Sequence, residues 1–221
     1  MPLSGSREPE EAGLTASGPV VCRNDLECRV FPFSLATELT TERLLLRPWT
    51  RGEVADVLAD RRSPRWARDF PAEGDRVIAG VIAEQIAGAP EGSGSPDRPG
   101  SPDGSGDPAD PGAHGHRLIV ERESGLVVGS LSLLWPPSEG SVEIGYGVVA
   151  SRRGRGYASE AARALVAHAL TSPDVTTVYA EVELANPASL RVLEKAGLHR
   201  WSDDGATARF RATAAPKPPR P

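Results

Sequence analysis

The stretch SRRGRGYASEA, residues 151–161, places three arginines and two glycines between two patterns of different kinds. It follows the apolar, strand-like run EIGYGVV (143–149) and precedes an alanine-rich pattern with helical spacing. A turn from a strand into a helix needs one glycine and no arginine. The surplus of glycine and positive charge at this junction therefore indicates a binding loop.

The loop would lie at the amino end of a helix, where the first N–H groups have no helical partner and the dipole favours an anion. Gly154 and Gly156 let the backbone approach a phosphate, and Tyr157 and Ala158 begin the helix behind them. Positive charge around that phosphate comes from Arg152, Arg153 and Arg155. We interpret the loop as a cradle for a pyrophosphate, with a solvated basic turn as the alternative.

Two common phosphate-binding motifs do not fit. A P-loop needs Gly-Lys-Ser/Thr after its spacer, and none is present. A dinucleotide fingerprint needs a third glycine where this chain has Ser159, within repeated βαβ units. These departures leave a cofactor that is held at its pyrophosphate, with its long arm running back along the preceding strand.

The pattern along the chain predicts the order β α α β β β α β α β β. Strands are expected over 43–48, 116–124, 125–135, 141–149, 175–183, 199–205 and 207–213, and helices over 51–60, 74–89, 156–172 and 186–197. Thr50 and Asn186 suit helix N-caps, and Gly197 suits a C-terminal stop. The fold class is therefore α/β (α+β), with a mixed, mostly antiparallel sheet flanked by helices and one βαβ crossover around the glycine loop.

The domain boundaries follow from composition. Residues 1–36 are expected to be a disordered extension, 37–213 the folded domain and 214–221 a Pro-rich tail. Within the domain, half of the 28 positions in 88–115 are Gly or Pro, which predicts a disordered insertion. The HGH at 114–116 is interpreted as a solvated loop end, and no metal site is expected.

Composition limits the function classes. The net charge of −5 argues against a nucleic-acid partner, and no apolar run approaches membrane-spanning length. Cys22 and Cys28 are too few for a disulfide framework and are interpreted as free thiols. The first residues lack the apolar core of a signal peptide, so the expected location is the cytoplasm.

Several motifs together carry a family resemblance: TERLLLRPW (41–49), EIGYGV (143–148), RRGRGYASEA (152–161) and NPASLRVLEKAG (186–197). In this order they resemble the GNAT-fold N-acetyltransferases, with the closer match to the RimJ/RimL-like branch, over about residues 38–213. The resemblance implies an enzyme that uses acetyl-CoA as co-substrate and an amine acceptor, whose identity stays open. A homodimer is compatible with it. Two departures are Ser151, where many members have Gln or Arg, and the insertion at 88–115.

The resemblance also implies roles for single residues. The backbone at Val148 and Val149 would pair with the pantetheine arm of the cofactor, and Asn186 would contact that arm as well as cap its helix. Ser189 resembles a serine suggested to hydrogen-bond or protonate the leaving thiolate, the alternative being a plain capping role.

The strand before the loop holds the remaining candidates. Glu143 is either the base that takes the proton of the amine or a solvent-facing strand residue. Tyr146 either orients the substrate or packs in the core. Gly145 and Gly147 indicate a bulge that splays the strand, or a tolerated irregularity. Arg191 and Lys195 either meet the adenosine phosphate or face solvent.

The predicted function is thus acetyl transfer to a primary amine, on a protein N-terminus or a small molecule. No cysteine lies in the motifs, so direct transfer is expected rather than a covalent acetyl-enzyme. The alternative is a GNAT-like module that binds acyl-CoA without turnover.

Overall fold

A computed structural model describes residues 20–22, 28–30, 33–89 and 111–214. The strands are β1 (Val20–Cys22), β2 (Cys28–Val30), β3 (Leu39–Thr40), β4 (Leu44–Pro48), β5 (His116–Glu121), β6 (Val127–Leu133), β7 (Ser141–Val148), β8 (Thr177–Glu183), β9 (His199–Asp203) and β10 (Thr207–Thr213). The helices are α1 (Arg51–Leu58), α2 (Glu73–Ala87), α3 (Tyr157–Ala169) and α4 (Pro187–Ala196), with short 3-10 turns η1 (Pro111–His114) and η2 (Ala150–Arg152).

Eight strands form one sheet in the order β3-β4-β5-β6-β7-β8-β10-β9. All neighbours are antiparallel except β7 and β8, which are parallel and are joined through α3. The predicted mixed, mostly antiparallel sheet with one βαβ crossover is therefore confirmed.

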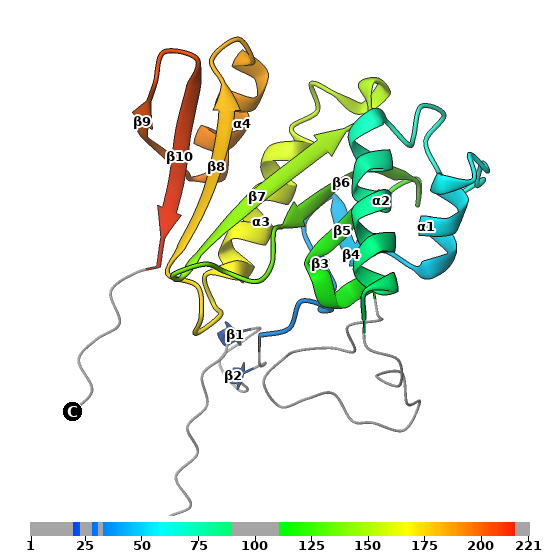
Figure 1. The fold of residues 1–221 in the computed structure, drawn as a ribbon, viewed down its shortest axis with the longest axis horizontal. Coiled ribbons are helices and arrows are strands. Elements are labelled where there is room, and N and C mark those ends of the chain that lie inside the picture. Colours follow the sequence, from blue (N-terminus) through cyan, green and yellow to red (C-terminus); the bar gives the residue numbers. More distant parts are fainter. Residues whose placement is uncertain (1–19, 23–27, 31–32, 90–110, 215–221) are drawn as a thin grey trace, which may run out of the picture.

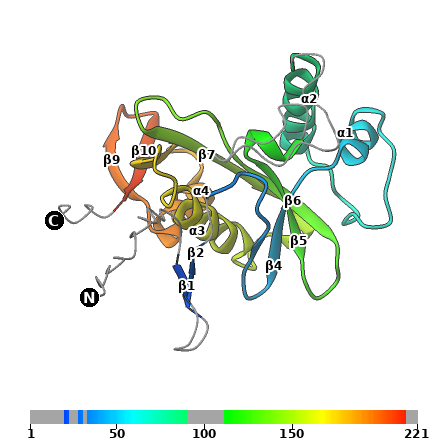
Figure 2. The same cartoon turned by 90° about the horizontal axis from the view of Figure 1, so that it is seen from below.

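Helices cover both faces of the sheet. Figure 1 shows α2 in front of β4–β6 and α3 behind the sheet, and Figure 2 shows α3 and α4 together on the face away from α1 and α2. The α3 face is packed by apolar side chains spaced along the helix, with Ala161, Ala162, Leu165 and Ala169 fully buried. The two pairs of helices thus lie on opposite faces of the sheet, and the apolar side of α3 packs against it.

The parallel pair is short. Only Ser141–Glu143 of β7 pairs with Thr177–Tyr179 of β8, and the two strands diverge beyond it (Figure 1). The pairing of β7 with β6 carries no register shift, so the strand splays from β8 without the bulge that was one interpretation of Gly145 and Gly147. The splay exposes one edge of β7 from Gly145 to Val148 immediately before the glycine loop.

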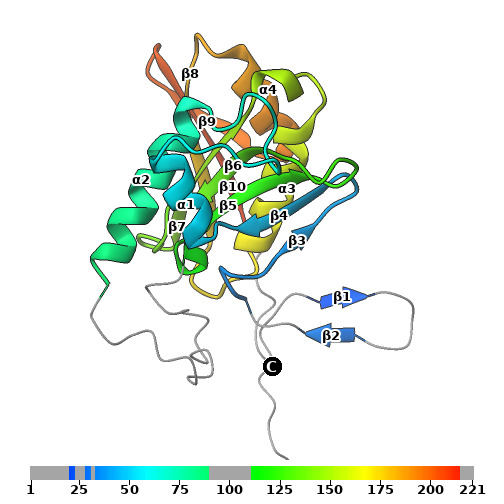
Figure 3. The same ribbon diagram turned by 90° about the vertical axis from the view of Figure 1, so that its right-hand side faces the viewer.

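The folded part begins before residue 37. Phe33 and Leu35 are buried, and the guanidinium of the fully buried Arg117 donates to the carbonyl oxygens of Leu35 and Thr37 at 2.7 and 2.9 Å. Within the expected disordered extension, β1 and β2 form a separate antiparallel pair in which Cys22 lies opposite Cys28 (Figure 3). The rest of residues 1–32 lies outside the described residues.

The insertion is also shorter than predicted. Residues 111–114 form η1, Pro111 and Gly112 are buried, and His116 is 3% exposed with Nδ1 at 2.8 Å from the Ser132 hydroxyl. The interpretation of HGH as a solvated loop end is therefore wrong for His116, because β5 carries it into the sheet. Residues 90–110 and 215–221 lie outside the described residues. Within the described ranges, no helix is long and apolar enough to cross a membrane.

Candidate active site

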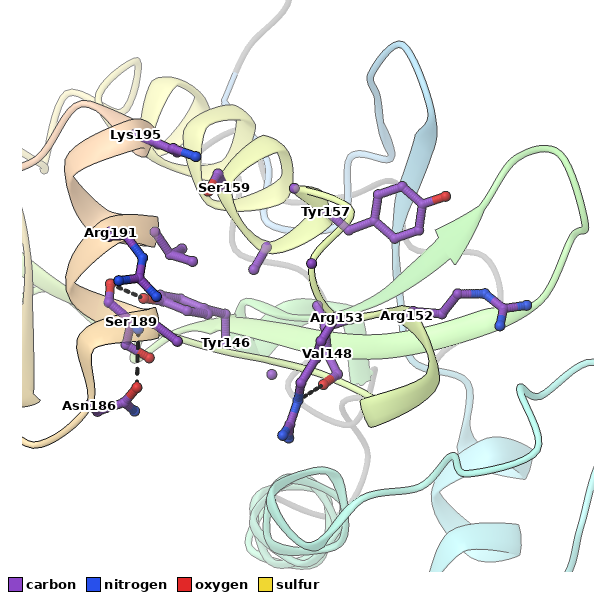
Figure 4. A pocket seen from close by; sticks show the side chains of 16 residues that line it. Tyr146, Val148, Arg152, Arg153, Tyr157, Ser159, Asn186, Ser189, Arg191 and Lys195 are labelled. Atoms are coloured by element: carbon purple, nitrogen blue, oxygen red, sulfur yellow. Dashed lines mark hydrogen bonds between the residues drawn. The ribbon is translucent and has the colours of Figure 1, made fainter.

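A cavity of about 490 Å³ opens where β7 and β8 part, between the start of α3 and α4 (Figure 4). Its lining combines the exposed part of β7, the glycine loop, the first turn of α3 and one face of α4. The residues are Tyr146, Gly147, Val148, Arg152, Arg153, Gly154, Gly156, Tyr157, Ala158, Ser159, Asn186, Ala188, Ser189, Arg191, Val192 and Lys195.

The glycine loop has the shape that its sequence requires. Gly154 and Gly156 have φ of +77° and +79°, in the left-handed region that side chains other than glycine rarely adopt. A Cβ at Gly154 would meet no atom within 4 Å, so backbone conformation and not crowding calls for glycine there. The two turns bring the chain from β7 into α3 with its amides facing outward.

The backbone N–H groups of this loop are free to bind a ligand. Within the part of the chain that the structure describes, the N–H groups of residues 154–159 donate no hydrogen bond to the protein. The first intrahelical bond across the junction is that of the Glu160 N–H to the Gly156 carbonyl at 3.0 Å. Several N–H donors without a partner, at the positive end of a 13-residue helix, form a candidate anion-binding site.

The unpaired edge of β7, from Gly145 to Val148, extends away from this candidate anion-binding site. The Val149 N–H donates to the Val128 carbonyl at 2.9 Å, so Val149 and Val128 form a hydrogen-bonded pair of the antiparallel β6–β7 ladder. Because such pairs alternate, the backbone groups of Tyr146 and Val148 point to the other side, into the gap left by β8. One of them, the Val148 carbonyl, accepts a hydrogen bond from the exposed Arg153 at 3.1 Å.

The N-terminus of α4 forms the opposite wall. Asn186 caps the helix by accepting the Ser189 N–H at 3.1 Å, which leaves its amide NH₂ group for another partner. The Tyr146 hydroxyl crosses the gap and donates to the Ser189 carbonyl at 3.2 Å. Figure 4 shows Tyr146, Ser189 and Asn186 gathered at this end of the cavity.

Glu143 lies on the other face of β7. Its neighbours Val142 and Ile144 are buried, whereas Glu143 is half-buried and pairs in register with Tyr179 where the two strands begin to part. Burial raises the pKa of Glu143, and the nearby Glu181 raises it further, against a hydrogen bond with Tyr179 that lowers it. Beside it, a Cβ at Gly145 or Gly147 would meet nothing within 4 Å, so the space over this face is open.

Two predicted cofactor residues are placed outside the cavity lining. Val149 is fully buried, and its N–H is used within the sheet. Arg155 pairs with Glu121 at 3.6 Å, and its carbonyl accepts from Arg43 at 2.9 Å. The other predicted cofactor residues all line the cavity, although the side chains of Arg152 and Tyr157 extend away from α4 (Figure 4).

Arg191 and Lys195, the sequence candidates for contact with the adenosine phosphate, line the cavity from α4. One residue near the site was not identified from the sequence. Asp69, in the connection between α1 and α2, accepts the N–H and hydroxyl of Ser151 at 2.8 and 2.6 Å. Burial opposes ionisation of Asp69, but these hydrogen bonds outweigh it and hold its pKa below the ordinary value. No local motif marks such a partner, because it is brought in by the fold.

Across the described ranges, no group of three or more His, Cys, Asp or Glu side chains is placed to hold a metal ion. The cavity lining is instead rich in N–H donors and cations, which suits an anionic ligand.

Comparisons with known proteins agree with this geometry. Residues 43–199 match the family model of the acetyltransferase (GNAT) domain. Over 81 residues the chain is 37% identical to the uncharacterized N-acetyltransferase YjdG of Bacillus subtilis strain 168; this match spans 36% of the chain and about half, 48%, of that relative.

Solved structures share the fold at low identity. A GNAT-family acetyltransferase from Bacillus anthracis has a TM-score of 0.52 at 20% identity, over 80% of this chain and 98% of its own. An acetyltransferase from Agrobacterium tumefaciens strain C58 has a TM-score of 0.50 at 22% identity, over 86% and 99%. RimL, a ribosomal L7/L12 alpha-N-protein acetyltransferase in complex with coenzyme A, has a TM-score of 0.53 at 16% identity, over 80% and 98%.

The family model covers well over half of the chain, and its matched residues contain the splayed strand, the open amides and the start of α4. The chain therefore belongs to the GNAT family of acetyltransferases.

Proposed function

We propose that this protein transfers an acetyl group from acetyl-CoA directly to a primary amine, on a protein N-terminus or on a small molecule. The observation that carries the proposal is the set of open amides at residues 154–159, next to the free edge of β7. One feature offers donors to a diphosphate, and the other offers backbone groups to an amide-containing arm.

The residues present fit coenzyme A. The amides of the glycine loop and the start of α3 would hold the diphosphate, with Arg153 supplying charge. Backbone groups of Tyr146 and Val148, and the free amide of Asn186, would hold the pantetheine arm. A second hollow of about 530 Å³ shares Gly156, Ser159 and Lys195 with the cavity, which supports a place for the adenosine phosphate near Lys195.

The chemistry assigned to the chain is proton transfer and orientation. As the amine nitrogen bonds to the acetyl carbon and the carbon–sulfur bond breaks, Glu143 takes the amine proton, directly or through a water. Its raised pKa suits a base that works near neutral pH. The Ser189 hydroxyl would donate a hydrogen bond to the departing sulfur. No cysteine lines the cavity within the described chain, which supports transfer without an acetyl-enzyme.

Within the family we place the chain in the RimJ/RimL-like branch, on TERLLLRPW, EIGYGV and the Asn186–Ser189 helix start. The fold of RimL, whose solved structure holds coenzyme A, supports this placement. This placement leaves the acceptor open.

The cofactor part is tested by charge at the loop. Gly154→Asp with Gly156→Asp should abolish binding of coenzyme A in calorimetry, because carboxylates would meet the diphosphate. Gly154→Asn with Gly156→Asn is the matched control, since Asn and Asp tolerate the left-handed backbone alike and only one is charged. Equal coenzyme A affinity of the Asp and Asn variants would contradict the proposed cradle.

The reaction is tested by release of free thiol from acetyl-CoA with a panel of amines. The panel contains peptides with free N-termini, polyamines and aminoglycosides. Turnover with any of them supports the transferase. Tight binding of coenzyme A with no thiol release from any amine would favour a binding module without turnover.

A further inference from the structure

Glu121 is the last residue of β5, and its side chain is only 5% exposed. Its Oε1 accepts the Tyr157 hydroxyl at 2.7 Å, and its Oε2 accepts the Ser124 hydroxyl at 2.6 Å. Two guanidinium groups complete the set: Arg152 Nε at 3.3 Å and Arg155 Nη1 at 3.6 Å. A single buried carboxylate thus gathers residues from both ends of the Gly154–Gly156 turn.

A second set of contacts, centred on Arg43, holds the same loop from the other side. Arg43, which precedes β4, donates to the Arg155 carbonyl at 2.9 Å and lies over the Tyr157 ring at 5.0 Å. It also pairs with Glu160 at 2.6 Å, and Glu160 accepts the Thr41 hydroxyl at 2.6 Å. Tyr157 is therefore fixed between Arg43 and Glu121, and the first residue of α3 cannot move without breaking both.

The charge at Glu121 has two opposite consequences for an anionic ligand. A negative charge beside a diphosphate site weakens binding by Coulomb repulsion, and it also neutralises Arg152 and Arg155. Against this, a loop that is already held in its binding shape loses less conformational entropy when the ligand arrives. The two effects predict opposite changes when the carboxylate is removed.

We propose that Glu121 is a positioning residue: it holds the glycine loop with its amides facing the cavity before the diphosphate of acetyl-CoA binds. The inference rests on the proposed function and adds a residue that does not line the cavity. It assigns Arg155 to the shape of the loop, and it leaves the contact with the diphosphate to backbone amides and to Arg153.

Burial by itself would raise the pKa of Glu121, but the hydrogen bonds from Ser124, Tyr157 and Arg152 outweigh it and hold that pKa below the ordinary value. The hydrogen bond to Glu121 in turn raises the pKa of Tyr157, since the neutral phenol is the donor. At neutral pH, Glu121 is therefore ionised and accepts the hydrogen bond of the neutral Tyr157 hydroxyl.

The test compares Glu121→Gln and Tyr157→Phe with Glu123→Gln, an exposed carboxylate in the same β5–β6 turn. Coenzyme A affinity is measured by calorimetry, and the KM for acetyl-CoA and kcat are measured with a turnover-competent amine. For Glu121→Gln and Tyr157→Phe we expect affinity to fall, and KM to rise, by about tenfold or more, the loss of one charge-assisted hydrogen bond. At saturating acetyl-CoA, the kcat of Glu121→Gln should stay within about twofold, since the lost contact acts on binding and not on the chemical step.

Glu123→Gln should match the parent chain in all three values. Unchanged or tighter binding in Glu121→Gln and Tyr157→Phe would overturn the inference and leave charge neutralisation as the effect of Glu121. If Glu121→Gln does not fold, Tyr157→Phe decides alone, because it removes one hydroxyl and keeps the ring. Failure of the parent chain to bind coenzyme A would instead refute the proposed function.

Discussion

At the residue scale, Glu143 carries the prediction about chemistry. Glu143→Gln keeps the size of the side chain and removes its ability to take a proton, so kcat should fall by about 10²-fold or more. Coenzyme A affinity should not change, because Glu143 does not line the cavity. Since burial and Glu181 raise the pKa of Glu143, the parent chain should lose activity as pH falls through a value above 4.5.

Glu181→Gln is the matched control for this prediction. Glu181 is exposed on the next strand, and it raises the pKa of Glu143 by its negative charge. Its removal should move the acidic limb of the pH–rate profile to lower pH, with the plateau unchanged. An unchanged limb in Glu181→Gln, or full activity in Glu143→Gln, would assign the base to another group.

Single residues also show where sequence reasoning ends. The role of Gly154 and Gly156 in the loop was predictable, because a left-handed backbone at a strand–helix junction requires glycine. The partners of the arginines were not predictable, because Arg152 and Arg155 pair with Glu121, which is near in space and far in sequence. For Arg191 and Lys195 the sequence was compatible with either a cofactor contact or a solvent-facing role, and the fold places both residues on the cavity.

At the element scale, the helix ends followed from local rules. Thr50 accepts the Glu53 N–H at the start of α1, Asn186 caps α4, and Gly197 ends α4 with φ of +92°. The order of these strands along the chain and the single parallel pair were likewise predictable from periodicity and connection length. The strand ends were less so: β5 ends at Glu121 and β6 begins at Val127, whereas strands over 116–124 and 125–135 were expected. What local rules could not give is the distance over which β7 and β8 stay paired, which decides the size of the cavity.

The second prediction separates the two roles of Asn186 at the start of α4. Asn186→Ser keeps an oxygen that can cap the helix and loses the amide NH₂ that we propose contacts the cofactor arm. We expect the thermal midpoint to stay near that of the parent chain while the KM for acetyl-CoA rises severalfold.

Asn186→Ala is the comparison for that prediction. It loses the cap as well, so it should cost about 1 kcal/mol of unfolding free energy in addition to the same rise in KM. If Asn186→Ser leaves the KM unchanged, the side chain serves the helix alone, and the contact with the cofactor arm must be withdrawn.

At the scale of the whole molecule, buried basic groups fasten the N-terminal segment to the core. His168 lies with Nε2 at 3.0 Å from the Ser34 carbonyl and stacks on Phe33 at 4.8 Å, and Phe33 stacks on Trp135 at 5.5 Å. Arg117 holds the next residues, as described above. The N-terminal segment is therefore held by a histidine that stays neutral and by a buried arginine whose two Nη groups donate to carbonyl oxygens.

This arrangement predicts acid sensitivity. Burial lowers the pKa of His116 and of His168 from 6.5 to about 4, with smaller contributions from His114 and Arg117 respectively. Between pH 6.5 and about 4 the unfolded chain binds protons at both sites and the folded chain does not. The free energy of unfolding should thus be complete above pH 6.5 and fall as pH decreases, by up to about 1.4 kcal/mol per pH unit for each histidine.

The slope must be measured by difference, because Asp75 and Glu143 have raised pKa values and act in the opposite direction over part of this range. Urea unfolding at a series of pH values would compare His116→Gln with His168→Gln in one chain against His199→Gln, whose histidine is exposed on β9. The double variant should be less stable at neutral pH but should have a shallower dependence on pH, since it takes up fewer protons on unfolding. His199→Gln should keep the slope of the parent chain. Equal slopes in the double variant and in His199→Gln would mean that His116 and His168 bind as many protons in the folded chain as in the unfolded chain. Burial would then not lower their pKa values, and the predicted acid sensitivity would be wrong.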